Sequence, residues 1–211
     1  MSATGVIVWG TGGHARVVSE IIELTDGCEV AGYLDDFART DTFLDRPIFG
    51  GRDRLPELLA HGLNEFVVAI GNCNVRLEAV RHGLSLGWQS RVWVHPRSSV
   101  SAHAKIGPGT VICPGAVVST HAELGAGCIV NTMASVDHDC RLADGVHICP
   151  GAHLAGDVHV GEGSWIGIGS SVVEGKKIGS GVLIGAGSVV NRNIPDGVKA
   201  WGIPARVQKG V

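Results

Sequence analysis

Aromatic side chains, net charge and long apolar runs are all scarce in this chain of 211 residues. Aromatic residues make up 5% of the chain while glycine occupies 32 positions, a balance expected of a tightly turning chain with a thin core. The formal net charge is −3, so the chain lacks the basic field that attracts nucleic acid. No stretch of about 18 consecutive apolar residues occurs, and we therefore predict no membrane span.

Cysteine pairs of the C-x-x-C type are also missing. The six cysteines are at positions 28, 73, 113, 128, 140 and 149. Without such a pair, we expect reduced thiols rather than disulfides or a redox motif. The apolar N-terminal run leads into a glycine-rich turn without a basic region or a signal cleavage site, so we expect a cytoplasmic protein.

The sequence does contain an aliphatic residue at every sixth position over nearly one hundred residues. All seventeen of these positions hold valine, isoleucine or leucine: Val94, Val100, Ile106, Ile112, Val118, Leu124, Val130, Val136, Leu142, Ile148, Leu154, Val160, Ile166, Val172, Ile178, Ile184 and Val190. The residue two places before each is nearly always small, as at Ala116, Ala134 and Ala152. A fixed short period of this kind predicts a solenoid, whose units bury their apolar sides by stacking.

One large and one small residue in every six suit a narrow prism with three flat faces. Three hexapeptides would form one coil, so residues i and i+18 would stack about 4.8 Å apart. The repeats resemble those of the hexapeptide-repeat acyltransferases, and this resemblance implies a left-handed parallel β-helix for residues 93–211. Lys176 interrupts the line of small residues, and we expect a bulge at residues 174–177.

Residues 1–92 follow a different pattern, in which apolar runs alternate with amphipathic stretches. The sequence predicts strands at residues 6–9, 29–34 and 66–70, and helices at 16–24, 52–61 and 74–86. Such alternation is typical of a small parallel α/β sheet. We therefore expect a Rossmann-like α/β domain that precedes the β-helix.

The first predicted strand runs into a glycine-rich turn in which Gly10, Gly12 and Ala15 match G-x-G-x-x-G/A. Three interpretations stay open: an NAD site, a site for a nucleotide diphosphate, which we favour, and a purely structural turn. Ligands of open parallel sheets bind beyond the carboxyl ends of the strands. The loops at those ends supply the candidate residues Gly12, Gly13, His14, Asp35, Asp36, Gly71 and Asn72. Backbone N–H groups of the first loop would hold phosphate, and the aspartates would accept hydrogen bonds from a ribose or a base.

Four motifs together carry a more specific resemblance. They are Gly-Thr-Gly-Gly-His at 10–14, Leu-Asp-Asp-Phe at 34–37, Ala-Ile-Gly-Asn at 69–72 and Trp-Gly-Ile-Pro-Ala-Arg at 201–206. Combined with the hexapeptides, they resemble the nucleotide-sugar N-acetyltransferases of bacterial bacillosamine and perosamine synthesis and the related sialic acid O-acetyltransferases. The resemblance covers nearly the whole chain. It implies a homotrimer with its active site between chains, which transfers acetyl from acetyl-CoA to the amine of a nucleotide-linked 4-amino sugar.

Among the ten histidines, His138 is our candidate general base. It lies two residues after the repeat position Val136, outside the inward lines, and would stack between Thr120 and Gly156, which leave room for a substrate. A histidine titrates near neutral pH and can take a proton there, whereas a surface histidine in a polar turn is the alternative. In the resembling family the base is a histidine followed by an acidic residue, often glutamate. Here the pair is His138-Asp139, so the carboxylate is one methylene shorter.

The resemblance also implies roles for four further positions. The backbone N–H of Gly156 would stabilise the oxyanion, and His147 would hold the substrate or the acetyl carbonyl. An exposed solenoid histidine is the alternative for His147. Ile168 and Ala186 would line the acetyl-CoA groove between two chains.

No metal site and no acyl-enzyme are expected. His147, His153 and His159 lie six residues apart and thus on different faces, which prevents them from converging on one ion. Cys140 lies on the inward line, where its thiol would be buried. Two rival functions remain open: O-acetylation of sialic acid or another sugar, and a non-catalytic trimeric solenoid that binds sugar nucleotides.

Overall fold

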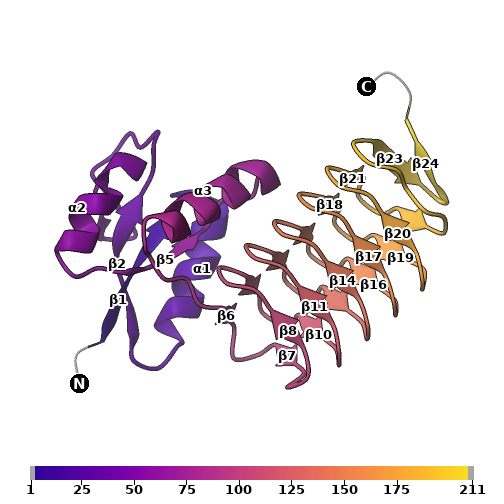
Figure 1. Ribbon diagram of the computed structural model, residues 1–211, viewed down its shortest axis with the longest axis horizontal. Coiled ribbons are helices and arrows are strands. Elements are labelled where there is room, and N and C mark those ends of the chain that lie inside the picture. Colours follow the sequence, from indigo (N-terminus) through magenta and orange to yellow (C-terminus); the bar gives the residue numbers. More distant parts are fainter. Residues whose placement is uncertain (1–2, 209–211) are drawn as a thin grey trace.

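The computed structural model describes residues 3–208, which form a small α/β domain followed by a long solenoid (Figure 1). The domain contains a parallel sheet with the strand order β2-β1-β5. Its strands are β1 (Thr4–Trp9), β2 (Cys28–Leu34) and β5 (Glu65–Val68), with a small hairpin of β3 (Thr42–Phe43) and β4 (Arg46–Pro47). Its helices are α1 (Gly13–Glu23), α2 (Leu55–Ala60), α3 (Cys73–Ser85) and the 3-10 turn η1 (Arg52–Arg54).

The buried strands of this domain form where the sequence predicts them. Val6, Ile7, Val8 and Trp9 are at most 1% exposed, because β1 is central in the sheet and helices cover it. Helix α1 begins three residues earlier than predicted, at Gly13, with Gly12 as its N-cap. The hairpin β3–β4 was not predicted from the sequence.

The solenoid has three faces, each a parallel sheet whose strands are two residues long except near the C-terminal end. Face 1 consists of β6 (Trp93–Val94), β9 (Val111–Ile112), β12 (Ile129–Val130), β15 (His147–Ile148), β18 (Trp165–Ile166), β21 (Leu183–Ile184), β23 (Lys199–Gly202) and the antiparallel β24 (Ala205–Val207). Face 2 consists of β7 (Ser99–Val100), β10 (Val117–Val118), β13 (Ser135–Val136), β16 (His153–Leu154), β19 (Ser171–Val172) and β22 (Val189–Val190). Face 3 consists of β8 (Lys105–Ile106), β11 (Glu123–Leu124), β14 (Arg141–Leu142), β17 (His159–Val160) and β20 (Lys177–Ile178).

The six-residue period therefore has the predicted structural meaning. Val136 pairs with Val118 on one side and Leu154 on the other, so the coils advance by the predicted three hexapeptides as far as Val190. The last coil is shorter, because Ile178 pairs with Ile194 and Leu183 with Lys199. Every repeat position from Ile112 to Val190 is at most 5% exposed. The small residues of the second line, such as Ala134, are fully buried near the corners.

Residues 174–177 do not form a bulge, so this prediction is wrong. The Gly175 N–H donates to the Gly156 carbonyl at 3.0 Å, and the Lys176 carbonyl accepts from the His159 N–H at 2.9 Å. These bonds keep the coil in register. Lys176 fits because it is partly exposed and its ammonium reaches the Glu174 carbonyl at 3.0 Å.

The α/β domain is packed against the first coils of face 1. Outward side chains of that face, Trp93, Val111 and Ile129, are fully buried and share one apolar cluster with Val18 and Ala15 of α1. The domain thus covers the beginning of face 1 and leaves the later strands of that face open, as Figure 1 shows. Among residues 3–208, no helix is both long and apolar enough to cross a bilayer.

Candidate active site

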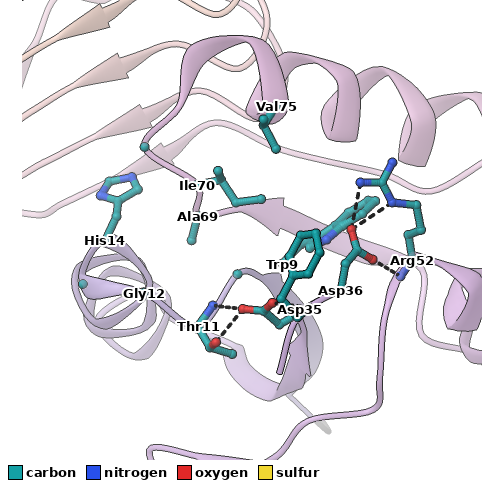
Figure 2. A pocket seen from close by; sticks show the side chains of 14 residues that line it. Trp9, Thr11, Gly12, His14, Asp35, Asp36, Arg52, Ala69, Ile70 and Val75 are labelled. Carbon is teal, nitrogen blue, oxygen red and sulfur yellow. Dashed lines mark hydrogen bonds and ion pairs between the residues drawn. The ribbon is translucent and has the colours of Figure 1, made fainter. Parts of the chain in front are cut away.

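A pocket of about 490 Å³ opens at the carboxyl ends of β1, β2 and β5 (Figure 2). Six of the seven residues predicted to bind the nucleotide line it: Gly12, Gly13, His14, Asp35, Asp36 and Gly71. The seventh, Asn72, instead caps α3, because its side-chain oxygen accepts from the N–H groups of Asn74 and Val75 at 3.1 Å. The glycine-rich turn is open, since a Cβ on Gly12 or Gly13 would meet nothing within 4 Å.

Asp35 holds the glycine-rich turn in place. Its Oδ2 accepts from the backbone N–H of Thr11 at 3.1 Å and from the Thr11 hydroxyl at 2.5 Å. Its Oδ1 accepts from the N–H of Phe37 at 2.9 Å. The carboxylate therefore links the ends of β1 and β2.

Asp36 is engaged by Arg52, a residue that the sequence did not single out because it falls in a predicted helix. The Arg52 N–H and Nε donate to the carboxylate at 2.7 and 2.9 Å (Figure 2). The guanidinium also reaches Glu78 at 3.0 Å. Burial alone would raise the pKa of Asp36, but the hydrogen bonds from Arg52 hold this pKa below its usual value. Arg52 also lies 5.5 Å from the centre of the Trp9 ring and so helps to close one end of the pocket.

His138 lies in the turn between β13 and β14, at the corner that joins faces 2 and 3. Its Nδ1 is 2.8 Å from Oδ2 of Asp139, so the shorter carboxylate does reach the ring. Asp139 adopts a left-handed backbone, with φ of 60°, which an aspartate tolerates. Asp137 accepts from the His138 N–H at 2.7 Å and fixes the turn from the other side.

The hydrogen bond between His138 and Asp139 decides which nitrogen of the ring carries the proton. If Nδ1–H donates to Asp139, the lone pair on Nε2 is free to take a proton. The hydrogen bond to Asp139 raises the pKa of His138, with smaller contributions from the charges of Asp137 and Asp157. The ring is exposed, as a base that meets a substrate must be.

Gly156 occupies the next coil directly over the His138 ring. A Cβ at Gly156 would lie 2.6 Å from Nε2 of His138 and even closer to Cε1. Only glycine fits there without moving the imidazole. The Gly156 N–H has no hydrogen-bond partner within residues 3–208, so this donor next to the ring is unused by the fold.

His147 is buried rather than exposed, so the interpretation as a surface histidine is wrong. It is 5% exposed, and its ring lies 4.4 Å from that of Trp165. The Asn131 amide nitrogen is 3.1 Å from Nε2, while the amide oxygen accepts from the Thr132 N–H at 2.8 Å. Asn131 therefore donates to Nε2 and keeps the ring proton on Nδ1, which finds no partner in the described part of the chain.

His147 and His14 are both kept neutral. Burial and then the charge of Arg76 lower the pKa of His147 to about 3 and that of His14 to about 4. Neither ring can serve as a cation near neutral pH. The sequence did not single out Asn131 or Arg76. Asn131 meets His147 only through the stacking of two successive coils, and Arg76 acts where the two parts of the chain meet.

The predicted site residues lie in three separate places. The pocket and His147 are on the side of face 1, whereas His138, Asp139 and Gly156 are at the corner of faces 2 and 3, opposite face 1. Ile168 and Ala186 are exposed and stack at the corner of faces 1 and 2. Cys140 is buried, and burial raises the pKa of its thiol to about 11, which leaves it unreactive. No group of metal ligands occurs among residues 3–208.

Comparison with known proteins matches both parts of the chain. Residues 5–82 match the family model described as the PglD N-terminal domain. A stretch of 115 residues is 39% identical to UDP-N-acetylbacillosamine N-acetyltransferase of Bacillus subtilis and covers 51% of this chain and 50% of that relative. The chain therefore spans about half the length of this curated relative.

Two solved structures match over almost the entire chain. The acetyltransferase domain of PglB from Neisseria gonorrhoeae is 37% identical with a TM-score of 0.91, over 97% of this chain and 100% of that one. PerB from Caulobacter crescentus, in complex with CoA and GDP-perosamine, is 37% identical with a TM-score of 0.92, over 97% of both chains. These likenesses confirm the predicted fold class, an α/β domain followed by a left-handed parallel β-helix.

Proposed function

Because this chain belongs to the nucleotide-sugar N-acetyltransferase family of hexapeptide-repeat acyltransferases, we propose that it transfers an acetyl group from acetyl-CoA to a nucleotide-linked 4-amino sugar. The observation that carries the proposal is the exposed His138–Asp139 pair beneath an unused glycine N–H. A base and an oxyanion donor side by side are the two groups that acyl transfer requires.

In the proposed mechanism the amine of the sugar attacks the thioester carbonyl directly. Nε2 of His138 takes one proton from the attacking nitrogen, and the N–H of Gly156 stabilises the negative charge on the carbonyl oxygen. The tetrahedral intermediate then collapses, the C–S bond breaks, and the proton on His138 passes to the CoA thiolate. No acyl-enzyme is needed, which agrees with the burial of Cys140.

We propose that the pocket holds the nucleotide and that the amine meets His138 of a neighbouring protomer. The pocket is on the side of face 1, and His138 is at the opposite corner of the same prism. One chain alone therefore cannot bring its own base to its own pocket. A homotrimer with the active site between chains satisfies this geometry, and the exposed Ile168 and Ala186 would line the acetyl-CoA groove there.

The relatives indicate the class of acceptor. They include a UDP-N-acetylbacillosamine N-acetyltransferase and a protein in complex with GDP-perosamine, and we propose the same substrate class here. We also propose that the protein works in the cytoplasm, where buried thiols such as Cys128 and Cys140 stay reduced. The acidic balance of the chain suggests neither a nucleic-acid nor a membrane partner.

Replacement of the base tests the mechanism. His138→Asn should lower acetyl-CoA turnover by about 100-fold or more, because asparagine cannot accept the proton. Turnover is measured as CoA release with a panel of UDP-, GDP- and dTDP-linked 4-amino sugars, and free sialic acid is included as an oxygen acceptor. Unchanged turnover in the variant would remove the base assignment. Turnover with sialic acid alone would replace N-acetylation by O-acetylation, and no turnover with binding intact would favour a binding module.

A further inference from the structure

Arg76 of α3 is completely buried where the α/β domain meets the solenoid. Its Nε and Nη2 donate to the carbonyls of Gly127 and Gly145 in two successive coils, both at 2.8 Å. Its Nη1 donates to the carbonyls of Ile70 and Gly71 in the loop after β5, again at 2.8 Å. The guanidinium thus uses two carbonyls from each part of the chain.

The guanidinium of Arg76 is satisfied by backbone carbonyls rather than by a carboxylate. Within residues 3–208 no carboxylate forms an ion pair with it, whereas Arg81 on the same helix pairs with Asp144 and Glu162. An arginine stays protonated in proteins, and a buried charge without an opposite charge is costly. Carbonyl dipoles satisfy its N–H groups, but the field of a dipole falls off faster than that of the net charge. The positive potential therefore extends beyond the four carbonyls.

This potential reaches the pocket at the end that holds the glycine-rich turn. Ile70 and Gly71, which accept from Arg76, are also part of the pocket wall. His14 follows the two glycines and lines the same pocket, and the charge of Arg76 contributes to its lowered pKa. Since His14 is neutral, Arg76 is the cationic group that lies behind this part of the wall.

We propose that Arg76 is the buried counter-charge of the ligand's diphosphate and makes the pocket selective for nucleoside diphosphates over uncharged nucleosides. The assignment rests on the proposed function, because it takes the pocket to be the nucleotide site. Arg76 acts through the wall without touching the ligand, so it is a positioning and specificity residue. A ligand whose phosphates lie at the open glycine turn would supply the opposite charge that the fold lacks.

Affinity ratios separate this role from a purely structural one. The dissociation constants of UDP and uridine, and of GDP and guanosine, are measured by calorimetry for the unaltered protein and for three variants. Arg76→Gln removes the charge but keeps N–H donors, and it should reduce the preference for the diphosphate roughly tenfold or more. Arg76→Lys keeps the charge and should retain most of that preference. Arg81→Gln, which removes a surface contact of α3 with the solenoid, should leave the preference unchanged.

The outcomes distinguish failure of this assignment from failure of the proposed function. The role of the Arg76 charge would be overturned if Arg76→Gln kept the full preference for the diphosphate, or if the lysine and glutamine variants lost it equally. Either result would leave the nucleotide site itself in place. No binding of any nucleoside diphosphate by the unaltered protein would overturn the nucleotide site itself. If Arg76→Gln does not fold, the solvent-protected Nε–H signal of Arg76 in the unaltered protein gives a second measurement by NMR. That signal should shift more with UDP or GDP than with the nucleoside, and equal shifts would contradict the proposal.

Discussion

Asp139 and His138 share one hydrogen bond, and this bond decides which ring nitrogen can act as a base. With Nδ1 directed at the carboxylate, Nε2 is left for the substrate. The same bond stabilises the protonated ring and raises the pKa of His138. Asp139, which orients the proposed base, therefore also sets the pH range in which His138 is neutral.

Asp139→Asn should move the acidic limb of the pH profile of kcat/KM to lower pH. The raised pKa of His138 depends first on its hydrogen bond to the carboxylate, so loss of that charge lets the pKa fall. The neutral base then persists at a lower pH, although the rate at the plateau should decrease because the ring is less well oriented. His14 and His147, with pKa values of about 4 and about 3, stay neutral in this range and do not contribute to the limb.

Asp139→Glu is the matched control. It keeps the charge and restores the longer side chain that the family often has at this position. We expect its acidic limb to stay close to that of the unaltered protein. If the unaltered protein and Asp139→Asn give the same pH profile of kcat/KM, the carboxylate of Asp139 does not set the pKa of His138.

At the scale of the element, each turn of the solenoid lies directly over the equivalent turn of the preceding coil. The second position after each strand of face 2 stacks on its equivalent in the neighbouring coil, so Thr120, His138 and Gly156 form one column. A side chain above His138 would occupy the space of its ring. The solenoid thus leaves room for the His138 ring by placing a glycine where the coil below carries a side chain.

Gly156→Ala should lower turnover by about tenfold or more while the protein stays folded. The new methyl group would press on Nε2 and Cε1 of His138 and turn the imidazole away. The backbone tolerates alanine, because Gly156 does not have a positive φ. Turnover is measured as CoA release, and folding is followed by circular dichroism.

A double-mutant cycle identifies the cause. In a His138→Ala background the ring is absent, so Gly156→Ala should have little further effect on turnover. An undiminished additional loss in that background would mean that Gly156 acts on the substrate or the coil rather than on His138.

The same repetition explains which features the sequence could reveal. A six-residue period is legible because each coil repeats the same local requirement, and it places His138 outside the core before any coordinates are known. The role of Arg76 depends on how the α/β domain packs against face 1, which no local pattern specifies. One signal did exist: Arg76 lies on the same helical face as Cys73, Leu77 and Val80, where an unpaired charge is out of place among buried residues.

At the scale of the whole molecule, the position of the pocket relative to His138 is the constraint that assembly must meet. The α/β domain covers the beginning of face 1 (Figure 1). The corner that carries His138 lies on the opposite side of the prism. Each proposed active site therefore combines the pocket of one protomer with the base of another. An isolated chain should bind a nucleotide but not turn over acetyl-CoA.

Two inactive variants should therefore restore activity when they share one trimer. Gly12→Trp fills the open pocket beside the glycine-rich turn, and His138→Asn removes the base. In a trimer that contains both variants, about one third of the sites would combine an intact pocket with an intact base from the neighbour. Differently tagged copies are co-expressed, purified through both tags and assayed for CoA release. Recovery of activity would show that the site is shared, whereas a mixture as inactive as either parent would place pocket and base in the same chain and contradict the trimeric site.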